Sequence, residues 1–344
     1  MNKRAVGFAL LCVACVSLAG VYLVRAEGAQ RSQPPAAKTA NGKTSDVKAA
    51  APVPVSDIIG KPHVTFRTLA IDGGDAGKVA LAGLDAPDGP RAVTYLKCLR
   101  VYLAAGSGIC MDAEGGLLNP YRAMFFGPDF SLRAVQQLPG LPSRARVSPD
   151  GRYGATTVFV GGDDYASGNF STRTTIYEMA TGTPVGDLEG FTVRNNGKKL
   201  QSSDFNFWGV TFSRQDGLFY ATLGTGDHRY LVRGDLAAKT VDVLRDGVEC
   251  PSLSPDGTRI AFKQRTTGPQ THWRPAVLDL ATLADHPLAE TRNVDDQIEW
   301  LDDSTVLYAV DTGFGPPGTW SAPADGSGQS KLFMTDADSP AVAR

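Results

Sequence analysis

Short apolar runs alternate with turn-forming residues along most of this chain, and the alternation repeats. The segment 146–152 (RVSPDGR) recurs at 252–258 (SLSPDGT) and, more loosely, at 211–217 (TFSRQDG). Ser, Pro, Asp and Gly in this order match a type I turn, so we expect these aspartates to shape hairpins rather than to act in catalysis. A β-rich run follows each turn, and such runs lie at 109–113, 153–160, 218–223, 259–263 and 305–310.

The length of the repeat is typical of a β-propeller blade. Five apolar residues stand ahead of the turns, at intervals of 46, 65, 41 and 47 residues: Val101, Val147, Phe212, Leu253 and Trp300. We attribute the longest interval to a long loop at 190–207. Four short antiparallel strands fit into each interval, as in a propeller blade.

The two ends of the repeat region predict how the ring closes. Segments 64–71, 78–84 and 91–96 supply the second, third and fourth strands of a blade with no first strand before them. Residues 338–343 resemble the opening of a blade and would provide that strand, which leaves no exposed edge. The expected fold is therefore an all-β, six-bladed propeller over residues 63–344.

The first 62 residues are expected to lie outside this fold. Lys3 and Arg4 precede an apolar run at 5–24 without a charged residue. This pattern indicates a signal peptide or a membrane anchor over residues 1–26, and both readings stay open. Residues 27–62, rich in Ala, Pro and Lys, are expected to form a disordered linker. The protein would then be extracytoplasmic, secreted or membrane-anchored, and would touch a membrane only through its N-terminal segment.

Composition agrees with a turn-rich β fold. The 344 residues include 38 Gly and 22 Pro, and 42% are hydrophobic, which disfavours helical bundles and wholesale disorder. Lys and Arg total 34 against 36 Asp and Glu, a net charge of −2. Without a basic excess, nucleic acid is not an expected partner.

Residues 62–344 resemble the TolB-like six-bladed propellers, in particular the exported TolB-like proteins of actinobacteria. The resemblance rests on the Ser-Pro-Asp-Gly motifs at 148–151 and 254–257. It implies the fold more than an activity, because TolB carries an additional N-terminal α/β domain that contacts other Tol components. Here the linker takes that place, which argues against a Tol-Pal role.

Long connections are expected on one face of the ring, which we call the long-loop face: 161–171, 190–207, 265–273 and 311–317. Long loops within a compact repeat are usually functional or disordered. Aromatic and charged residues together suit recognition of a protein or a cell-envelope carbohydrate. The candidate ligand-binding residues are Asp163, Asp164, Tyr165, Trp208, Asp227, His228, His272, Trp273 and Phe314.

No coherent catalytic set is found in the sequence. None of the four histidines has a zinc-binding spacing, and no Gly-x-Ser-x-Gly motif is present. We therefore expect a monomeric, non-enzymatic binding protein without a cofactor or metal. The alternative is a propeller enzyme, a metal-assisted glycan lyase or hydrolase, with His228, His272 and nearby aspartates at the pore mouth.

Three cysteines follow the N-terminal segment: Cys98, Cys110 and Cys250. An odd number permits one disulfide at most. Cys98 and Cys110 are the candidate pair because they are closest in sequence. A hairpin centred on Ser107 would place Cys110 opposite about residue 104, which leaves Cys98 out of register.

Overall fold

The computed structural model describes residues 52–69, 74–113, 120–267, 272–310 and 318–344. The expected signal or anchor segment, most of the expected linker, and Phe314 lie outside these residues. In the part described, no helix is long and apolar enough to cross a membrane.

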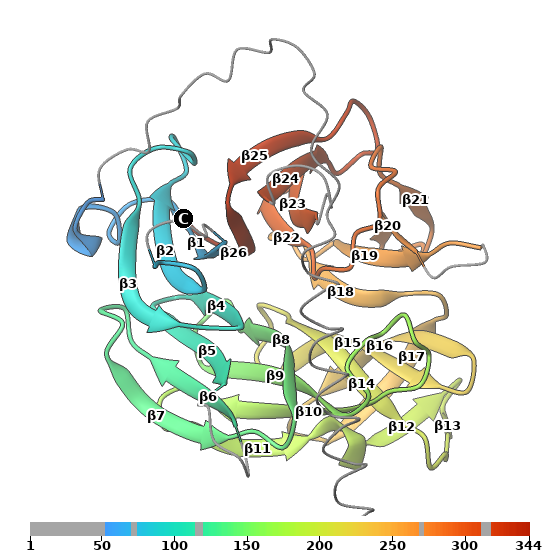
Figure 1. Cartoon of the computed structure of the whole chain (residues 1–344). Coiled ribbons are helices and arrows are strands. Elements are labelled where there is room, and N and C mark those ends of the chain that lie inside the picture. The colour runs from blue at the N-terminus through green and yellow to red at the C-terminus, as the bar shows by residue number, and fades with distance from the viewer. Residues whose placement is uncertain (1–51, 70–73, 114–119, 268–271, 311–317) are drawn as a thin grey trace, which may run out of the picture. The chain divides into compact units, whose positions relative to one another are not determined.

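Six sheets form the six blades of a propeller, each built on four antiparallel strands, which confirms the expected fold (Figure 1). From the inner strand outward, blade 1 has β26 (Ala337–Ala343), β1 (His63–Thr68), β2 (Lys78–Gly83) and β3 (Ala92–Lys97). Blade 2 has β4 (Arg100–Ala104), β5 (Ser107–Ala113), β6 (Tyr121–Phe126) and β7 (Leu132–Gln137). Blade 3 has β8 (Leu141–Val147), β9 (Tyr153–Gly161), β10 (Ser171–Glu178) and β11 (Thr183–Asp187).

The other three blades follow the same order. Blade 4 has β14 (Asn206–Phe212), β15 (Leu218–Thr225), β16 (His228–Asp235) and β17 (Thr240–Arg245). Blade 5 has β18 (Glu249–Leu253), β19 (Arg259–Arg265), β20 (Trp273–Asp279) and β21 (Asp285–Pro287). Blade 6 has β22 (Glu299–Asp302), β23 (Thr305–Val310), β24 (Gly318–Pro323) and β25 (Lys331–Thr335).

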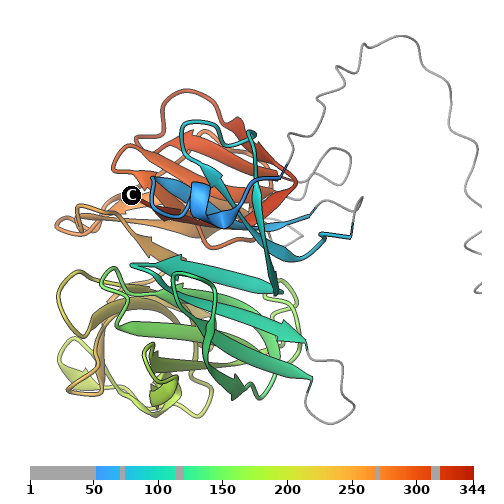
Figure 2. The ribbon, with the colours of Figure 1, turned by 90° about the vertical axis from the view of Figure 1, so that its left-hand side faces the viewer.

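The C-terminal strand closes the ring, as the sequence predicts. β26 pairs antiparallel with β1, with Thr65 opposite Ala341, and becomes the inner strand of blade 1. The Arg67 guanidinium also forms an ion pair with Asp338, and Arg67 Nε donates to the carboxylate at 2.7 Å. In Figure 2 the blue and red parts of the chain accordingly lie together on one side of the ring.

The Ser-Pro-Asp-Gly turns are held by their own side chains. In the first, the Tyr153 amide donates to Ser148 Oγ at 2.9 Å and the Arg152 amide to Asp150 Oδ1 at 3.0 Å. Gly151 has a φ of 72°, which disfavours a side chain there. Ser254 and Asp256 repeat these bonds in the second turn. The aspartates thus shape the hairpins, as expected.

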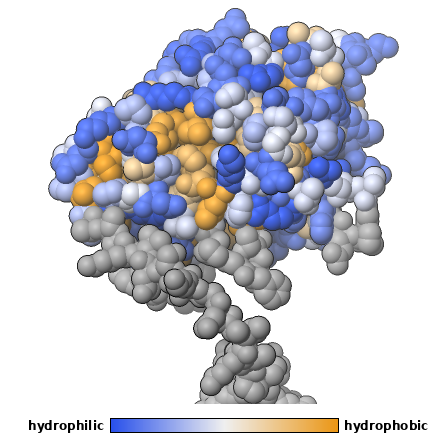
Figure 3. Space-filling view, turned by 90° about the horizontal axis from the view of Figure 1, so that it is seen from above, coloured by the Kyte–Doolittle hydropathy of each residue, from blue (hydrophilic) through white to orange (hydrophobic). Residues whose placement is uncertain are grey.

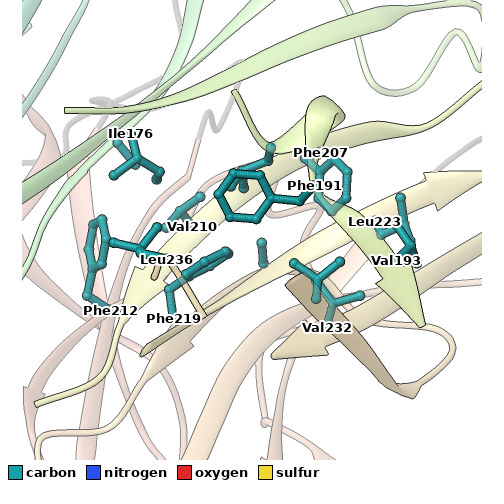
Figure 4. Packing of buried hydrophobic residues seen from close by; sticks show 14 residues of the cluster. Ile176, Phe191, Val193, Phe207, Val210, Phe212, Phe219, Leu223, Val232 and Leu236 are labelled. Atoms are coloured by element: carbon teal, nitrogen blue, oxygen red, sulfur yellow. The ribbon is translucent and has the colours of Figure 1, made fainter. Parts of the chain in front are cut away.

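Two segments expected to be irregular pack on the propeller instead. Segment 190–207 contains β12 (Thr192–Asn195) and β13 (Lys198–Lys199), which follow the one-turn helix η2 (Leu188–Gly190) and extend blade 4 to six strands. β12 runs parallel to β17, so Val193 is buried in the cluster between blades 3 and 4 (Figure 4).

The expected linker ends before residue 62. Here the one-turn helix η1 (Val55–Asp57) and the buried Ile58 pack against blades 1 and 2, together with Val53 and Ile59. The Val53 amide also donates to the Arg91 carbonyl at 3.1 Å. These aliphatic side chains make burial favourable, and this part of the chain belongs to the propeller.

Candidate functional site

The ring has two different faces. In each blade, the turn between the first and second strands lies on one face, and the connection between the second and third strands lies on the other. We call the side of the Ser-Pro-Asp-Gly turns the turn face. It lies opposite the long-loop face, and the inner strands of the six blades run between the two.

Three aromatic residues expected to contact a ligand on the long-loop face are buried instead. Tyr165, Trp208 and Trp273 are only 2%, 0% and 1% exposed, and they form one cluster with Phe159 and Cys250. Rings that pack on each other in this way are not available to a surface partner. These three residues are therefore part of the interior of the propeller, and ligand binding by them stays a prediction.

A buried cation explains why these rings turn inward. Lys263 is 0% exposed, and its Nζ lies 4.3 Å from the centre of the Trp273 ring and 5.0 Å from that of Tyr165. The ammonium also donates to the Asp295 carboxylate, which accepts a second bond from Arg144 Nη2 at 3.0 Å. Aromatic faces and a carboxylate compensate a lysine that has lost its water.

The electrostatics of Asp295 agree with this arrangement. Burial alone would raise its pKa, but the positive charges of Lys263 and Arg144 outweigh burial and lower the pKa to about 2. Asp295 therefore stays ionised at neutral pH. Together with the aromatic cluster, these ion pairs form a buried network that joins blades 3, 4 and 5.

The other candidate residues of the long-loop face are exposed where the structure describes them. They are Asp163, Asp164, Asp227, His228 and His272. The His228 imidazole pairs with Asp246 and stacks on Tyr230, with ring centres 4.9 Å apart. Within the described ranges, no three His, Cys, Asp or Glu side chains are grouped to hold a metal ion.

A cavity of about 800 Å³ opens on the turn face, where no sequence pattern predicts it. It is lined by residues from the inner strands of all six blades, among them Tyr102, Arg146, Thr211, Ser252, Glu299 and Val342, and also by His63 from β1. We call this cavity the funnel. Its lining combines hydroxyls and charges with the apolar side chains of Leu103, Val147, Phe212 and Trp300.

Polar groups from distant blades meet at the floor of the funnel. The Arg146 guanidinium, from blade 3, pairs with Glu299 from blade 6 and donates to the Ile298 carbonyl at 2.8 Å. Tyr102, from blade 2, donates to Glu299 at 3.1 Å and lies under the guanidinium, 4.4 Å from ring centre to Cζ. These contacts join blades 2, 3 and 6 at the floor of the funnel.

Burial has the largest effect on the pKa values of Glu299 and Tyr102 at the floor of the funnel. It raises the pKa of the Glu299 carboxyl, although the Arg146 charge opposes the change. Burial also raises the pKa of Tyr102, and the nearby Glu299 charge acts in the same direction. Tyr102 therefore remains a neutral donor at neutral pH, which suits a rigid structural network.

The rim of the funnel is more accessible than its floor. Lys61, Arg214, Asp256 and Arg344 line it and are exposed. Arg214 Nε donates to the Pro255 carbonyl at 3.0 Å, which bridges the turns of blades 4 and 5. The rim thus offers charges of both signs around a partly apolar interior.

Cys98 and Cys110 form a disulfide in the structure, with 5.4 Å between their Cα atoms. The expected register is wrong, because Cys110 lies opposite Val101 and not residue 104. This shift brings Cys110 close to the connection between β3 and β4, where Cys98 lies. Cys250 is a free, buried thiol.

Several solved structures share this fold. TolB from Acinetobacter baumannii matches with a TM-score of 0.58 and 17% identity, over 82% of this chain and 66% of that one. The chain thus spans just under two thirds of that TolB. A putative TolB from Agrobacterium tumefaciens matches with a TM-score of 0.50 and 11% identity, over 81% of this chain and 91% of that one.

A chain from a nidogen/laminin complex also matches, with a TM-score of 0.54 and 12% identity, over 82% of this chain and 98% of that one. No protein-family model and no curated protein matches the sequence. At such identities the likeness concerns the fold alone. The chain is therefore a six-bladed β-propeller with the TolB-like fold.

Proposed function

We propose that this protein is an extracytoplasmic, non-enzymatic propeller that binds an extended segment of a partner protein in the funnel. The observation that carries the proposal is the funnel itself, an opening of about 800 Å³ at the axis of the ring. An N-terminal signal or anchor at 1–26 and a tether after it would place the propeller outside the cytoplasm.

The lining of the funnel favours a peptide over a small cofactor. Binding pockets for small molecules measure roughly 300–1,000 Å³ and are mostly apolar with a few polar groups. The funnel is at the upper end of this range, and its exposed rim carries Arg214 and Asp256 next to apolar walls. A peptide presents side chains of both kinds together with backbone donors and acceptors. TolB and a nidogen/laminin complex among the structural neighbours are compatible with a propeller that binds proteins.

The long-loop face is the alternative contact surface to the funnel. Its exposed charged residues, Asp163, Asp164, Asp227, His228 and His272, surround loops that differ in length from blade to blade.

Elsewhere the surface offers little for a large apolar interface. Among the described residues, the exposed large hydrophobic side chains are Tyr95, Leu132, Val135, Val160 and Leu332. Figure 3 shows one side of the molecule, on which hydrophobic residues lie between many hydrophilic ones.

A propeller enzyme is the alternative to a binding protein. It would use His228 and His272 on the long-loop face, but His228 is engaged by Asp246 and Tyr230. The polar groups of the funnel floor are likewise bonded to one another. Binding therefore accounts for the arrangement with fewer assumptions than catalysis.

Site-specific photo-crosslinking tests which face binds. A photoreactive residue is placed at Arg214 on the funnel rim or, as the matched control, at Asp227 on the opposite face, and cells that produce the protein are irradiated. We expect a discrete protein adduct from position 214 and none from position 227, with the partner peptide identified by mass spectrometry. Adducts from position 227 alone would transfer the function to the long-loop face, and an absence of adducts at position 214 contradicts the proposal.

A further inference from the structure

A second cavity, of about 440 Å³, lies on the long-loop side where blades 3 and 4 meet. Its walls come from three segments: the start of β10, the chain leading into β14, and the turn between β15 and β16. The second of these segments belongs to the insertion that carries β12 and β13. We call this space the insertion cavity.

The walls of the insertion cavity are fixed by hydrogen bonds within the protein. The Asp204 carboxylate accepts bonds from the Thr225 hydroxyl at 2.6 Å and the Gly226 amide at 2.7 Å, and a further one from Ser202. Asn206 Oδ1 accepts from the Thr172 amide at 2.9 Å. These bonds join the insertion to both neighbouring blades, so the cavity needs little ordering when a ligand enters.

One side of the cavity is aromatic. Phe170 and Phe205 line it and are half-buried, and the buried Trp208 lies behind Phe170 with the ring centres 5.4 Å apart. Gly224 packs directly on Trp208, since a Cβ at this position would lie 2.7 Å from the indole ring. The Phe170 ring therefore rests on a rigid support.

The polar groups of the cavity include both a cation and an anion. Arg229 Nη1 donates to the carbonyls of Gly226 and His228, at 3.0 and 2.8 Å, and among the described residues no partner is found for Nη2. Hydrogen bonds from Ser202, Thr225 and Gly226 lower the pKa of Asp204 to about 2, so this carboxylate stays ionised. A carboxylate has about four acceptor sites, and Asp204 keeps capacity for another donor.

We propose that the insertion cavity binds a neutral saccharide. A sugar hydroxyl both donates and accepts, which matches the Asp204 carboxylate and the Arg229 guanidinium together, whereas a purely anionic ligand would face the Asp204 charge. The C–H faces of a sugar ring are apolar and fit the rings of Phe170 and Phe205. The volume also lies within the range of roughly 300–1,000 Å³ found for small-molecule sites.

This site is independent of the funnel, which lies on the opposite face. It gives the insertion a purpose beyond covering the edge of blade 4. It also assigns ligand binding on the long-loop face to residues other than the exposed charged residues named above.

Direct binding measurements with the purified protein test the proposal. Glucose, galactose, mannose and N-acetylglucosamine, and a disaccharide of each, are titrated into the protein at up to about 10 mM. Binding is followed by ligand-observed NMR and calorimetry. We expect at least one neutral sugar to bind. Replacing Phe170→Leu or Arg229→Lys should weaken that binding roughly tenfold or more.

Matched controls separate the site from general effects. Phe333→Leu changes another half-buried phenylalanine, in β25, and Arg233→Lys changes an exposed arginine on the same strand as Arg229. Both should bind like the unchanged protein. If a cavity variant fails to fold, amide shifts of Gly224 and Gly226 in the unchanged protein report the site directly. No binding by any of these neutral sugars, or amide shifts confined to residues outside the insertion cavity, would overturn the proposal.

Discussion

At the residue scale, some polar side chains of this propeller act within their own turn and others act across the ring. Ser148 and Asp150 shape a turn within their own segment, so their role follows from the sequence. Lys263 lies in a β-rich run where a lysine normally faces solvent. Its burial depends on Trp273 from the next strand and on Asp295, 32 residues away. The aromatic residues Tyr165 and Trp273 are buried because they pack on this lysine from other segments of the chain.

Glu189 should make stability depend on pH in the neutral range. Burial raises its pKa to about 7, although its carboxylate accepts backbone bonds from Thr174 and Phe207. Because this pKa is raised above its ordinary value, the folded protein holds a proton that the unfolded chain releases. The free energy of unfolding should therefore fall as pH rises from about 4 to about 7, and then level off.

Urea denaturation at a series of pH values checks this dependence. The Glu189→Gln variant should lose much of the decline, whatever its stability at a single pH. Glu178→Gln alters an exposed carboxyl on the neighbouring β10 and serves as the control. Equal pH profiles for the unchanged protein and Glu189→Gln would show that Glu189 has no such effect.

At the element scale, most strands were predictable because turn residues and alternating burial are local signals. The insertion was not, because β12 pairs with β17 in parallel and Val193 lies opposite Val241, 48 residues later. Two parallel strands need a long connection between them, and no short sequence motif indicates that they pair. The register of the hairpin at Ser107 was also missed, and only the structure shows how Cys110 reaches Cys98.

The Cys98–Cys110 disulfide should stabilise the junction of blades 1 and 2. It joins the end of β3 to β5, with 12 residues of sequence separation. A crosslink across a loop of this length removes unfolded-state entropy worth roughly 3 kcal/mol. Replacing both cysteines by alanine should lower the free energy of unfolding by about this amount, as measured with urea.

Two comparisons test the disulfide effect. Treating the unchanged protein with a reductant should lower its stability in the same way, while the double variant should not respond. Cys250→Ala removes the buried free thiol and keeps the crosslink, so reductant should lower its stability as much as that of the unchanged protein. A double variant as stable as the unchanged protein would argue against a stabilising bond.

At the scale of the whole molecule, the number of blades and the closure of the ring followed from the repeat, whereas the two ends of the channel did not. The funnel floor joins Arg146 to Glu299, which are 153 residues apart. The sequence does not show that these inner strands converge. Loop length alone therefore favoured the long-loop face, whereas the cavity of about 800 Å³ lies on the turn face.

The C-terminal strand should be essential for the entire ring. Deleting residues 338–344 removes nearly all of β26, its pairing with β1 and the Arg67–Asp338 ion pair. It also removes Val342, whose amide donates to Glu299 at the funnel floor. Since the inner edge of blade 1 would then be exposed and the ring open, we expect loss of the cooperative thermal transition and a tendency to aggregate.

Calorimetry and light scattering of the truncated protein measure both effects. Asp338→Asn is the matched control, because it removes the ion pair while keeping the strand and should lower the melting midpoint only slightly. If closure holds the ring together, adding the missing segment as a synthetic peptide should restore part of the transition, by pairing with β1 as β26 does. A truncated protein that melts at the same midpoint as the full chain would mean that the propeller is stable without closure.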